Sequence, residues 1–154
     1  MARCLVGLYI VSISLISCNN RLSNDHLSIF KYNESSTIGS LDPAFAKDQA
    51  TIWATNQLFN GLVQLDKDLK PIPSISKKWI ISDDLLLYKF FLRDDVYFHN
   101  HQLFKEGLGR RVVANDFEYS FNRLIDKDVA SPGSWILNNV DSFYAESDLS
   151  LIHI

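Results

Sequence analysis

The sequence predicts a mixed α/β fold, a lobe of α+β type in which strands are interleaved with two helices. Two segments, 49–59 and 112–126, have the apolar spacing of amphipathic helices, and short apolar runs bounded by turn residues lie between them. The composition, 47% hydrophobic and 21% charged in 154 residues, is typical of a globular chain with one core. A 12% content of aromatic residues also suits a packed interior.

The segment before the first helix is expected to form a strand and then a turn-rich loop. Residues 27–33, LSIFKYN, alternate in the manner of a strand, and residues 34–43, ESSTIGSLDP, are rich in turn residues. Asp48 is placed to cap the helix at 49–59, and Gly61 stands where a C-terminal cap belongs. We expect the large apolar residues of this helix to form its buried stripe. They are Ile52, Trp53, Leu58 and Phe59.

The middle of the chain is expected to contribute a strand and a hairpin. GLVQLD at 61–66 has strand character. PIPSISKKW at 71–79 contains two prolines, so we expect no regular element there beyond one short turn. Two strand-like runs at 79–98 flank Asp83 and Asp84, which predicts a hairpin in which the aspartates form the turn rather than a catalytic dyad.

The second helix has the strongest pattern in the sequence. Asn115 is the expected N-cap of the helix at 112–126, and Glu118 follows three residues later, as in a capping box. Its apolar residues share one face. They are Phe117, Phe121, Leu124 and Ile125. The SPG sequence at 131–133 then breaks the chain, and SWILNN at 134–139 predicts a further short helix.

Residues 1–17 are predicted to be a lipoprotein signal peptide. Arg3 supplies a positive charge, and residues 4–16 form an uncharged apolar run of 13 residues. This run is shorter than the about 20 residues that a membrane-spanning helix needs, and it suits the central part of a secretory signal. It ends in Leu15-Ile16-Ser17-Cys18, which resembles the bacterial lipobox, whose cysteine is lipidated and becomes the first residue of the mature chain.

Cys18 is therefore the predicted lipidation site, and residues 18–27 form the lipidated cysteine and a polar tether. The other interpretations are a plain signal peptide with an incidental cysteine, or a short membrane anchor. Cys4 would leave with the signal, so that Cys18 has no partner for a disulfide. Several acyl chains hold a protein stably at a membrane. We expect an exported protein that is lipid-anchored to the cell envelope, in the periplasm or on an outer membrane face.

Patterns typical of other function classes are absent from the sequence. The net charge is -3 and no lysine- or arginine-rich block is present, so we expect no nucleic-acid binding. His99 and His101 could share one face of a strand, but without a third ligand nearby we interpret them as loop histidines rather than a metal site. No nucleophile motif or phosphate loop occurs. We expect no enzyme activity, no cofactor and no metal.

Four segments, in order, resemble family 5 of the bacterial extracellular solute-binding proteins, the oligopeptide- and dipeptide-binding type. They are SLDPAFAKDQAT at 40–51, LFNGLVQLDKDLKPIPSISKKW at 58–79, SDDLLLYKFFLRDDVYFHN at 82–100 and RRVVANDFEYSFNRLIDKDVASP at 110–132. The resemblance covers about residues 28–137. Leu69 and Leu85 stand where the family usually has glycine, and Asn100-His101 replaces a usual Asp-Gly.

The resemblance implies a periplasmic-binding-protein-like fold of class II, with residues 28–148 as an incomplete N-terminal lobe. It implies a monomeric substrate-binding lipoprotein that captures a peptide by closure of two lobes and delivers it to the permease of an ABC importer. Three alternatives remain open. They are a family member that binds a metal complex or an oligosaccharide, a surface lipoprotein enzyme whose catalytic residues lie elsewhere, and a structural lipoprotein.

Two residues are candidate ligand contacts on the strength of this resemblance. Ser131 and Trp135 follow the second helix, where the family turns toward its cleft. The alternative is that Ser131 forms a turn and Trp135 belongs to the core. Residues 149–154, LSLIHI, are expected to be a non-native tail, because six codons that resemble the end of a transposon used in sequencing libraries would encode them. The alternative is a genuine apolar strand.

Overall fold

The computed structural model describes residues 31–154, and the chain divides into two units, 1–33 and 34–154. Residues 31–33 are not in a strand, whereas the rest of the expected strand at 27–33, the signal segment and Cys18 lie outside the described residues. Within the described part of the chain, no helix is both long and apolar enough to cross a membrane.

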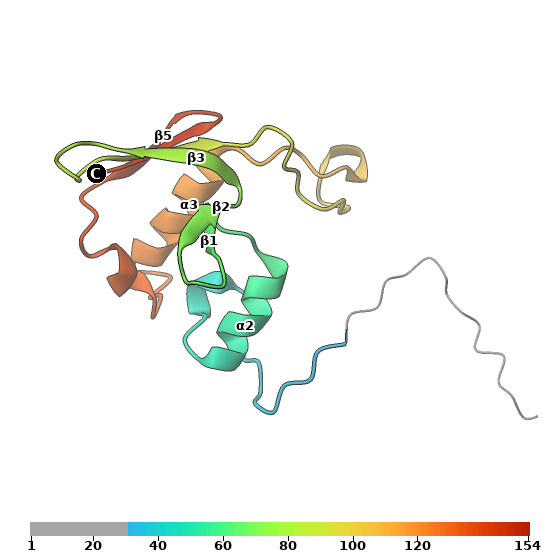
Figure 1. Ribbon diagram of the computed structural model, residues 1–154. Coiled ribbons are helices and arrows are strands. Elements are labelled where there is room, and N and C mark those ends of the chain that lie inside the picture. The colour runs from blue at the N-terminus through green and yellow to red at the C-terminus, as the bar shows by residue number, and fades with distance from the viewer. Residues whose placement is uncertain (1–30) are drawn as a thin grey trace, which may run out of the picture. The chain divides into compact units, whose positions relative to one another are not determined.

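The second unit contains a four-stranded antiparallel sheet, a separate two-stranded hairpin and two α-helices (Figure 1). The strands are β1 (Val63–Leu65), β2 (Pro71–Pro73), β3 (Ser76–Ile81), β4 (Tyr88–Leu92), β5 (Phe143–Ser147) and β6 (Ser150–His153). The helices are α2 (Gln49–Leu58) and α3 (Ala114–Ile125), with 3₁₀ turns η1 (Pro43–Phe45), η2 (Lys105–Gly107) and η3 (Ser134–Leu137). The predicted mixed fold is confirmed, as is the short helix after the SPG sequence.

Helix α3 lies against one face of the larger sheet (Figure 1), and the core lies between them. The strand order of this sheet is β3-β4-β6-β5. Leu92 of β4 and Leu151 of β6 are fully buried there. Phe121 of α3 meets the ring of Phe143 edge-on, with the two ring centroids 5.5 Å apart. The predicted apolar face of α3 is thus confirmed at Phe117 and Phe121, which both pack against this core. It is wrong at Ile125, which is 50% exposed at the end of the helix.

Helix α2 begins as predicted but buries a different face. The carboxylate of Asp48 accepts a hydrogen bond from the Thr51 backbone amide at 2.9 Å, which confirms the N-cap. The expected buried stripe is wrong, because its four large residues are between 41% and 55% exposed. The buried positions are instead those with small side chains, which allow neighbouring segments of the same chain to approach the helix closely. They are Ala50, Thr51, Ala54 and Thr55. The helix ends when Phe59 becomes extended, so Gly61 is not its cap.

Helix α3 is capped two residues before the predicted position. The expected N-cap, Asn115, lies inside the helix, and the cap position is Val113. The carboxylate of Asp116 accepts a hydrogen bond from the Val113 amide at 2.9 Å and so satisfies a free donor at the helix start. Glu118 does not cap the helix. Its carboxylate accepts a hydrogen bond from the Ala145 amide of β5 at 2.8 Å. Its role is therefore to fasten the helix to the sheet.

The two prolines at 71 and 73 do not prevent regular structure. They lie at the ends of β2, a three-residue strand that pairs only with β1 among the described residues, where a missing amide is tolerated. The predicted hairpin is confirmed by the pairing of β3 with β4. The short turn expected within 71–79 is wrong, because β3 already begins at Ser76. Leu69 and Leu85 both have positive φ, 60° and 62°, in the turns where the family usually has glycine.

The last residues of the chain are folded into the sheet. β6 lies between β4 and β5 and pairs antiparallel with both. This arrangement agrees with the alternative of an apolar strand at 149–154. The codon origin of this segment is decided by the nucleotide sequence and stays a prediction.

Candidate functional site

A groove lies between two chain segments that are far apart in the sequence. Its volume is about 580 Å³, and we call it the polar groove. One wall comes from η1, the start of α2 and the residues before them, and the other from the turn after α3. The lining residues are Gly39, Ser40, Phe45, Lys47, Asp48, Thr51, Ala130 and Pro132.

An ion pair between two residues that do not line the groove joins its two walls. Arg123, in the last turn of α3, donates from Nη1 to Oδ1 of Asp42 at 3.0 Å and from Nη2 to Oδ2 at 2.7 Å. Oδ1 of Asp42 also accepts the backbone amide of Ala44 at 3.0 Å, which caps η1. Because the planar guanidinium meets the carboxylate at two points, it fixes the orientation of η1 as well as its position.

Ser131 makes a second connection between the same walls. Its hydroxyl, on a side chain that is 6% exposed, donates to the carbonyl of Ala44 at 2.6 Å. The same hydroxyl accepts the amide of Gly133 at 3.1 Å. The preceding residue, Ala130, has φ near 50°, a strained conformation for a residue with a side chain. Ser131 thus forms a turn that is fastened to the opposite wall.

Charged groups of both signs stand at this groove. The hydrogen bond from Arg123 lowers the pKa of Asp42 from its ordinary value, with a further contribution from the Ala44 amide. The bond from the Thr51 amide lowers the pKa of Asp48, which therefore stays ionised at neutral pH. Lys47, next along the chain, lines the groove with the opposite charge. The groove therefore has one cationic and one anionic residue among its lining residues.

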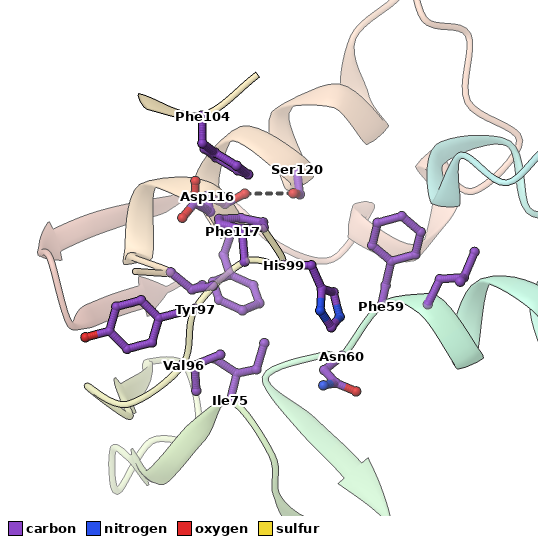
Figure 2. A pocket seen from close by; sticks show the side chains of 13 residues that line it. Phe59, Asn60, Ile75, Val96, Tyr97, His99, Phe104, Asp116, Phe117 and Ser120 are labelled. Atoms are coloured by element: carbon purple, nitrogen blue, oxygen red, sulfur yellow. Dashed lines mark hydrogen bonds between the residues drawn. The ribbon is translucent and has the colours of Figure 1, made fainter. Parts of the chain in front are cut away.

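A second hollow, of about 360 Å³, is mainly apolar, and we call it the apolar pocket (Figure 2). Side chains from the end of α2, the segment 96–99, the loop at Phe104 and α3 face it. The lining residues are Leu58, Phe59, Asn60, Ile75, Val96, Tyr97, Phe98, His99, Phe104, Val112, Asp116, Phe117 and Ser120.

The polar groups of α3 in the apolar pocket are already engaged with protein partners. Asp116 is paired with Arg110 and accepts the Val113 amide. The Ser120 hydroxyl donates to the Asp116 carbonyl at 2.7 Å (Figure 2). No arrangement of nucleophile and base is formed by these groups, so the geometry favours packing over chemistry.

The structure separates the sequence-predicted site residues. Ser131 lies behind the polar groove, whereas Trp135 lines neither hollow and is 69% exposed, so it is not part of the core. His99 lines the apolar pocket, and His101 accepts the Leu103 amide in the loop. Among residues 31–154 no cluster of three or more His, Cys, Asp or Glu side chains is placed to hold a metal.

Three residues at the polar groove were missed as site residues. Asp42 and Lys47 lie in the segment 40–51 and Arg123 lies in the segment 110–132, both of which resemble the family. The pieces were visible in the sequence, but the pairing of Asp42 with Arg123 was not. A contact across 81 residues leaves no local pattern.

Comparison with known proteins gives one consistent family. The family model for bacterial extracellular solute-binding proteins, family 5 Middle, matches residues 70–151. The dipeptide-binding protein DppE of Bacillus subtilis is 32% identical over 87 residues, which are 56% of this chain and 14% of that protein.

Two solved structures share the fold. OppA of Listeria monocytogenes bound to peptide matches with a TM-score of 0.70 and 29% identity, over 78% of this chain and 25% of that one. NikZ of Campylobacter jejuni in complex with Ni(L-His) matches with a TM-score of 0.62 and 25% identity, over 77% of this chain and 22% of that one.

These matches cover 13–18% of the length of the curated relatives. The structural neighbours are periplasmic binding proteins of the peptide-binding type, which confirms the predicted fold class. The relatives are solute-binding proteins rather than enzymes. The family model matches more than half of the residues of this chain, so the chain belongs to family 5 of the bacterial extracellular solute-binding proteins.

Proposed function

We propose that this chain is part of the substrate-binding lipoprotein of a peptide-type ABC importer. The observation that carries the proposal is the likeness of the chain to OppA of Listeria monocytogenes bound to peptide, at a TM-score of 0.70. The protein captures a peptide by closing two lobes and presents it to the permease. Because the chain spans only a small share of its relatives, the activity belongs to the full-length protein.

The polar groove is the part of this chain that contributes to the peptide site. Peptides are held in extended form by backbone hydrogen bonds, with charged groups at their two ends. Lys47 and Asp48 provide charges of both signs at one place, which suits a ligand that carries a carboxylate and an amine. The apolar pocket lacks such a pair, since its one carboxylate, Asp116, is neutralised by Arg110.

Peptide binding is tested by the thermal shift of the full-length protein, expressed from the complete gene, with a pool of random tripeptides. We expect a rise in Tm, because a ligand that binds only the folded state stabilises it. The matched control is the double variant Lys47→Ala, Asp48→Asn, in which Asn retains the helix cap. A rise that is equal in the double variant would remove the polar groove from the site, and no rise with any peptide would overturn the peptide assignment.

The second part of the proposal is that Cys18 anchors the protein in the membrane through acyl chains. The Cys18→Ala variant is expected to leave the membrane fraction, because the thiol that carries the lipid is lost. Cys4→Ala is the matched control and is expected to stay membrane-bound. Retention of Cys18→Ala in the membrane fraction would exclude this anchor.

A non-peptide solute is the second candidate. It is favoured by the likeness to NikZ of Campylobacter jejuni in complex with Ni(L-His). The same thermal-shift assay with nickel and histidine together, and with each alone, separates the two. A shift that requires both nickel and histidine, without a shift from tripeptides, would select the metal complex.

A further inference from the structure

The two walls of the polar groove are joined by side chains rather than by a shared sheet or helix. The ion pair between Asp42 and Arg123 spans 81 residues, and the bond from Ser131 to the Ala44 carbonyl spans 87. Both connections end on η1, one at its cap and the other at its middle residue. Together they form what we call the η1 latch.

The η1 latch acts on groove residues without belonging to the lining. Arg123 and Asp42 are absent from the lining of the polar groove, whereas Phe45 and Lys47, at and just after η1, are part of it. The turn amides of Phe45 and Ala46 donate to the Asp42 and Pro43 carbonyls at 3.0 and 3.2 Å, so the turn has only two backbone bonds of its own. A three-residue turn of this kind depends on its surroundings for a fixed conformation.

The opposite wall shows the same dependence. Ala130 keeps a positive φ next to Ser131, a conformation that a residue with a side chain retains only when neighbouring contacts impose it. Such residues cluster at ligand sites. The strained turn and the η1 latch are two independent observations, and both concern the walls of the polar groove.

We propose that Arg123 is a positioning residue for the polar groove, which it shapes through Asp42 and η1 without contacting the ligand. The nature of the ligand in this inference rests on the proposed function, whereas the contacts of Arg123 with Asp42 do not. Arg123 offers two parallel donors, so a lysine at this position keeps the charge but loses the second contact and the orientation that it fixes.

The chain offers a matched control for the loss of an arginine–aspartate pair. Arg93 and Asp95 form the same two-point contact, at 2.8 Å for each bond, but they are two residues apart in an exposed turn. Arg93→Gln thus removes an equivalent ion pair without touching the groove. Asp42→Asn complements Arg123→Gln, because asparagine still caps η1 while the charge is lost.

The first measurement is amide hydrogen exchange of the full-length protein, expressed from the complete gene, without ligand. In Arg123→Gln and Asp42→Asn, the amides of Phe45 and Ala46 are expected to exchange about tenfold faster or more, since a charge-assisted contact is lost. Arg123→Lys should be intermediate. The Phe90 amide in the sheet should be unchanged in every variant, and Arg93→Gln should match the wild type throughout.

The second measurement is the tripeptide pool concentration that gives half the thermal shift of the full-length protein. We expect it to rise about tenfold or more in Arg123→Gln and less in Arg123→Lys, with no change in Arg93→Gln. Unchanged exchange at Phe45 and Ala46, or faster exchange at Phe90 to the same degree, would overturn the positioning role.

The two proposals fail in different ways. A wild type that responds to no tripeptide counts against the proposed function, while the exchange at η1 still decides whether the latch exists. An Arg123→Gln variant that responds to tripeptides as strongly as the wild type, although its η1 amides exchange faster, would show that the latch shapes η1 without serving the ligand. This outcome would also overturn the positioning role.

Discussion

The polar groove and the apolar pocket are both hollows of this lobe, but different forces hold their walls. The walls of the polar groove are joined by the Asp42–Arg123 ion pair and by Ser131. Those of the apolar pocket include Ile75 and Val112, two buried members of the hydrophobic core. The first hollow depends on a few polar contacts and the second on the core itself.

This difference indicates how each hollow responds to change. Apolar burial is shared among many contacts, so the pocket changes shape only when the core is damaged. Polar contacts between two loops are few and individually replaceable, so the groove can change shape while the sheet stays folded. A binding site that must open and close is expected at a place such as the polar groove, where few polar contacts hold the walls.

The largest effect is expected from Ile75→Ala in the wall of the apolar pocket. The side chain is buried in the core, so its truncation leaves a cavity and lowers the free energy of unfolding by about 2–4 kcal/mol. Urea denaturation measures this loss. Leu103→Ala, at a side chain that is 85% exposed, should stay within about 0.5 kcal/mol of the wild type. Equal losses in the two variants would contradict the distinction between core and surface.

Gly109→Ala is expected to damage the same region through the backbone. A Cβ atom at Gly109 would clash with the carbonyl oxygen of Phe98, so the base of the 99–111 loop must move. We expect a loss of about 1–3 kcal/mol in the free energy of unfolding. The control is Gly39→Ala in the polar groove, where an added Cβ meets nothing within 4 Å. A stable Gly109→Ala with unchanged spectra would show that the loop base is adaptable.

Elements with a strong local pattern were predictable from the sequence. The period of Phe117 and Phe121 fixed the buried face of α3, and the aspartates at 83 and 84 marked the hairpin turn. The buried face of α2 was missed because its contacts are made by alanine and threonine, whose small side chains give no apolar stripe. Tertiary packing therefore overrode the expected stripe.

The candidate site was less predictable than the fold. Ser131 was singled out by resemblance, but its partner, the carbonyl of Ala44, is a backbone group that no side-chain pattern reveals. The cap of α3 illustrates the same limit, since the predicted Asn115 lies inside the helix, whereas Asp116 accepts the Val113 amide and also pairs with Arg110. Long-range partners decide which of several local options is used.

Ser131→Ala is expected to have a moderate effect that is confined to the polar groove. The variant leaves the buried Ala44 carbonyl without its donor, which lowers the free energy of unfolding by about 1–2 kcal/mol. Ser120→Ala is the counterpart in the apolar pocket. Its hydroxyl donates to a helix carbonyl four residues back, so its loss should be nearly neutral. A larger loss for Ser120→Ala would reverse the comparison.

Acid is expected to loosen the polar groove through Asp42. The bond from Arg123 lowers the pKa of Asp42 in the folded chain below its ordinary value of 3.8. The folded state thus binds this proton less tightly than the unfolded state, and the contribution to stability is present above about pH 4 and is lost as the pH falls through the lowered pKa. Urea midpoints measured from pH 6 down to pH 2 should depend less on pH in Asp42→Asn. An unchanged slope would show that Asp42 is not coupled to folding.

The smallest effect is expected from Ala130→Gly, which relieves strain in the groove wall. Glycine accepts a φ near 50° without the steric cost that alanine carries, and the greater freedom of the unfolded chain offsets part of this gain. The net change should be a stabilisation of less than about 1 kcal/mol. Leu69→Gly, at a positive φ in the β1–β2 turn away from the groove lining, is the matched control with a similar gain. Only Ala130→Gly should also alter the response to tripeptides, because only there does the strained residue belong to the groove. A response altered equally by both variants would mean that global stability, rather than the shape of the groove wall, governs binding.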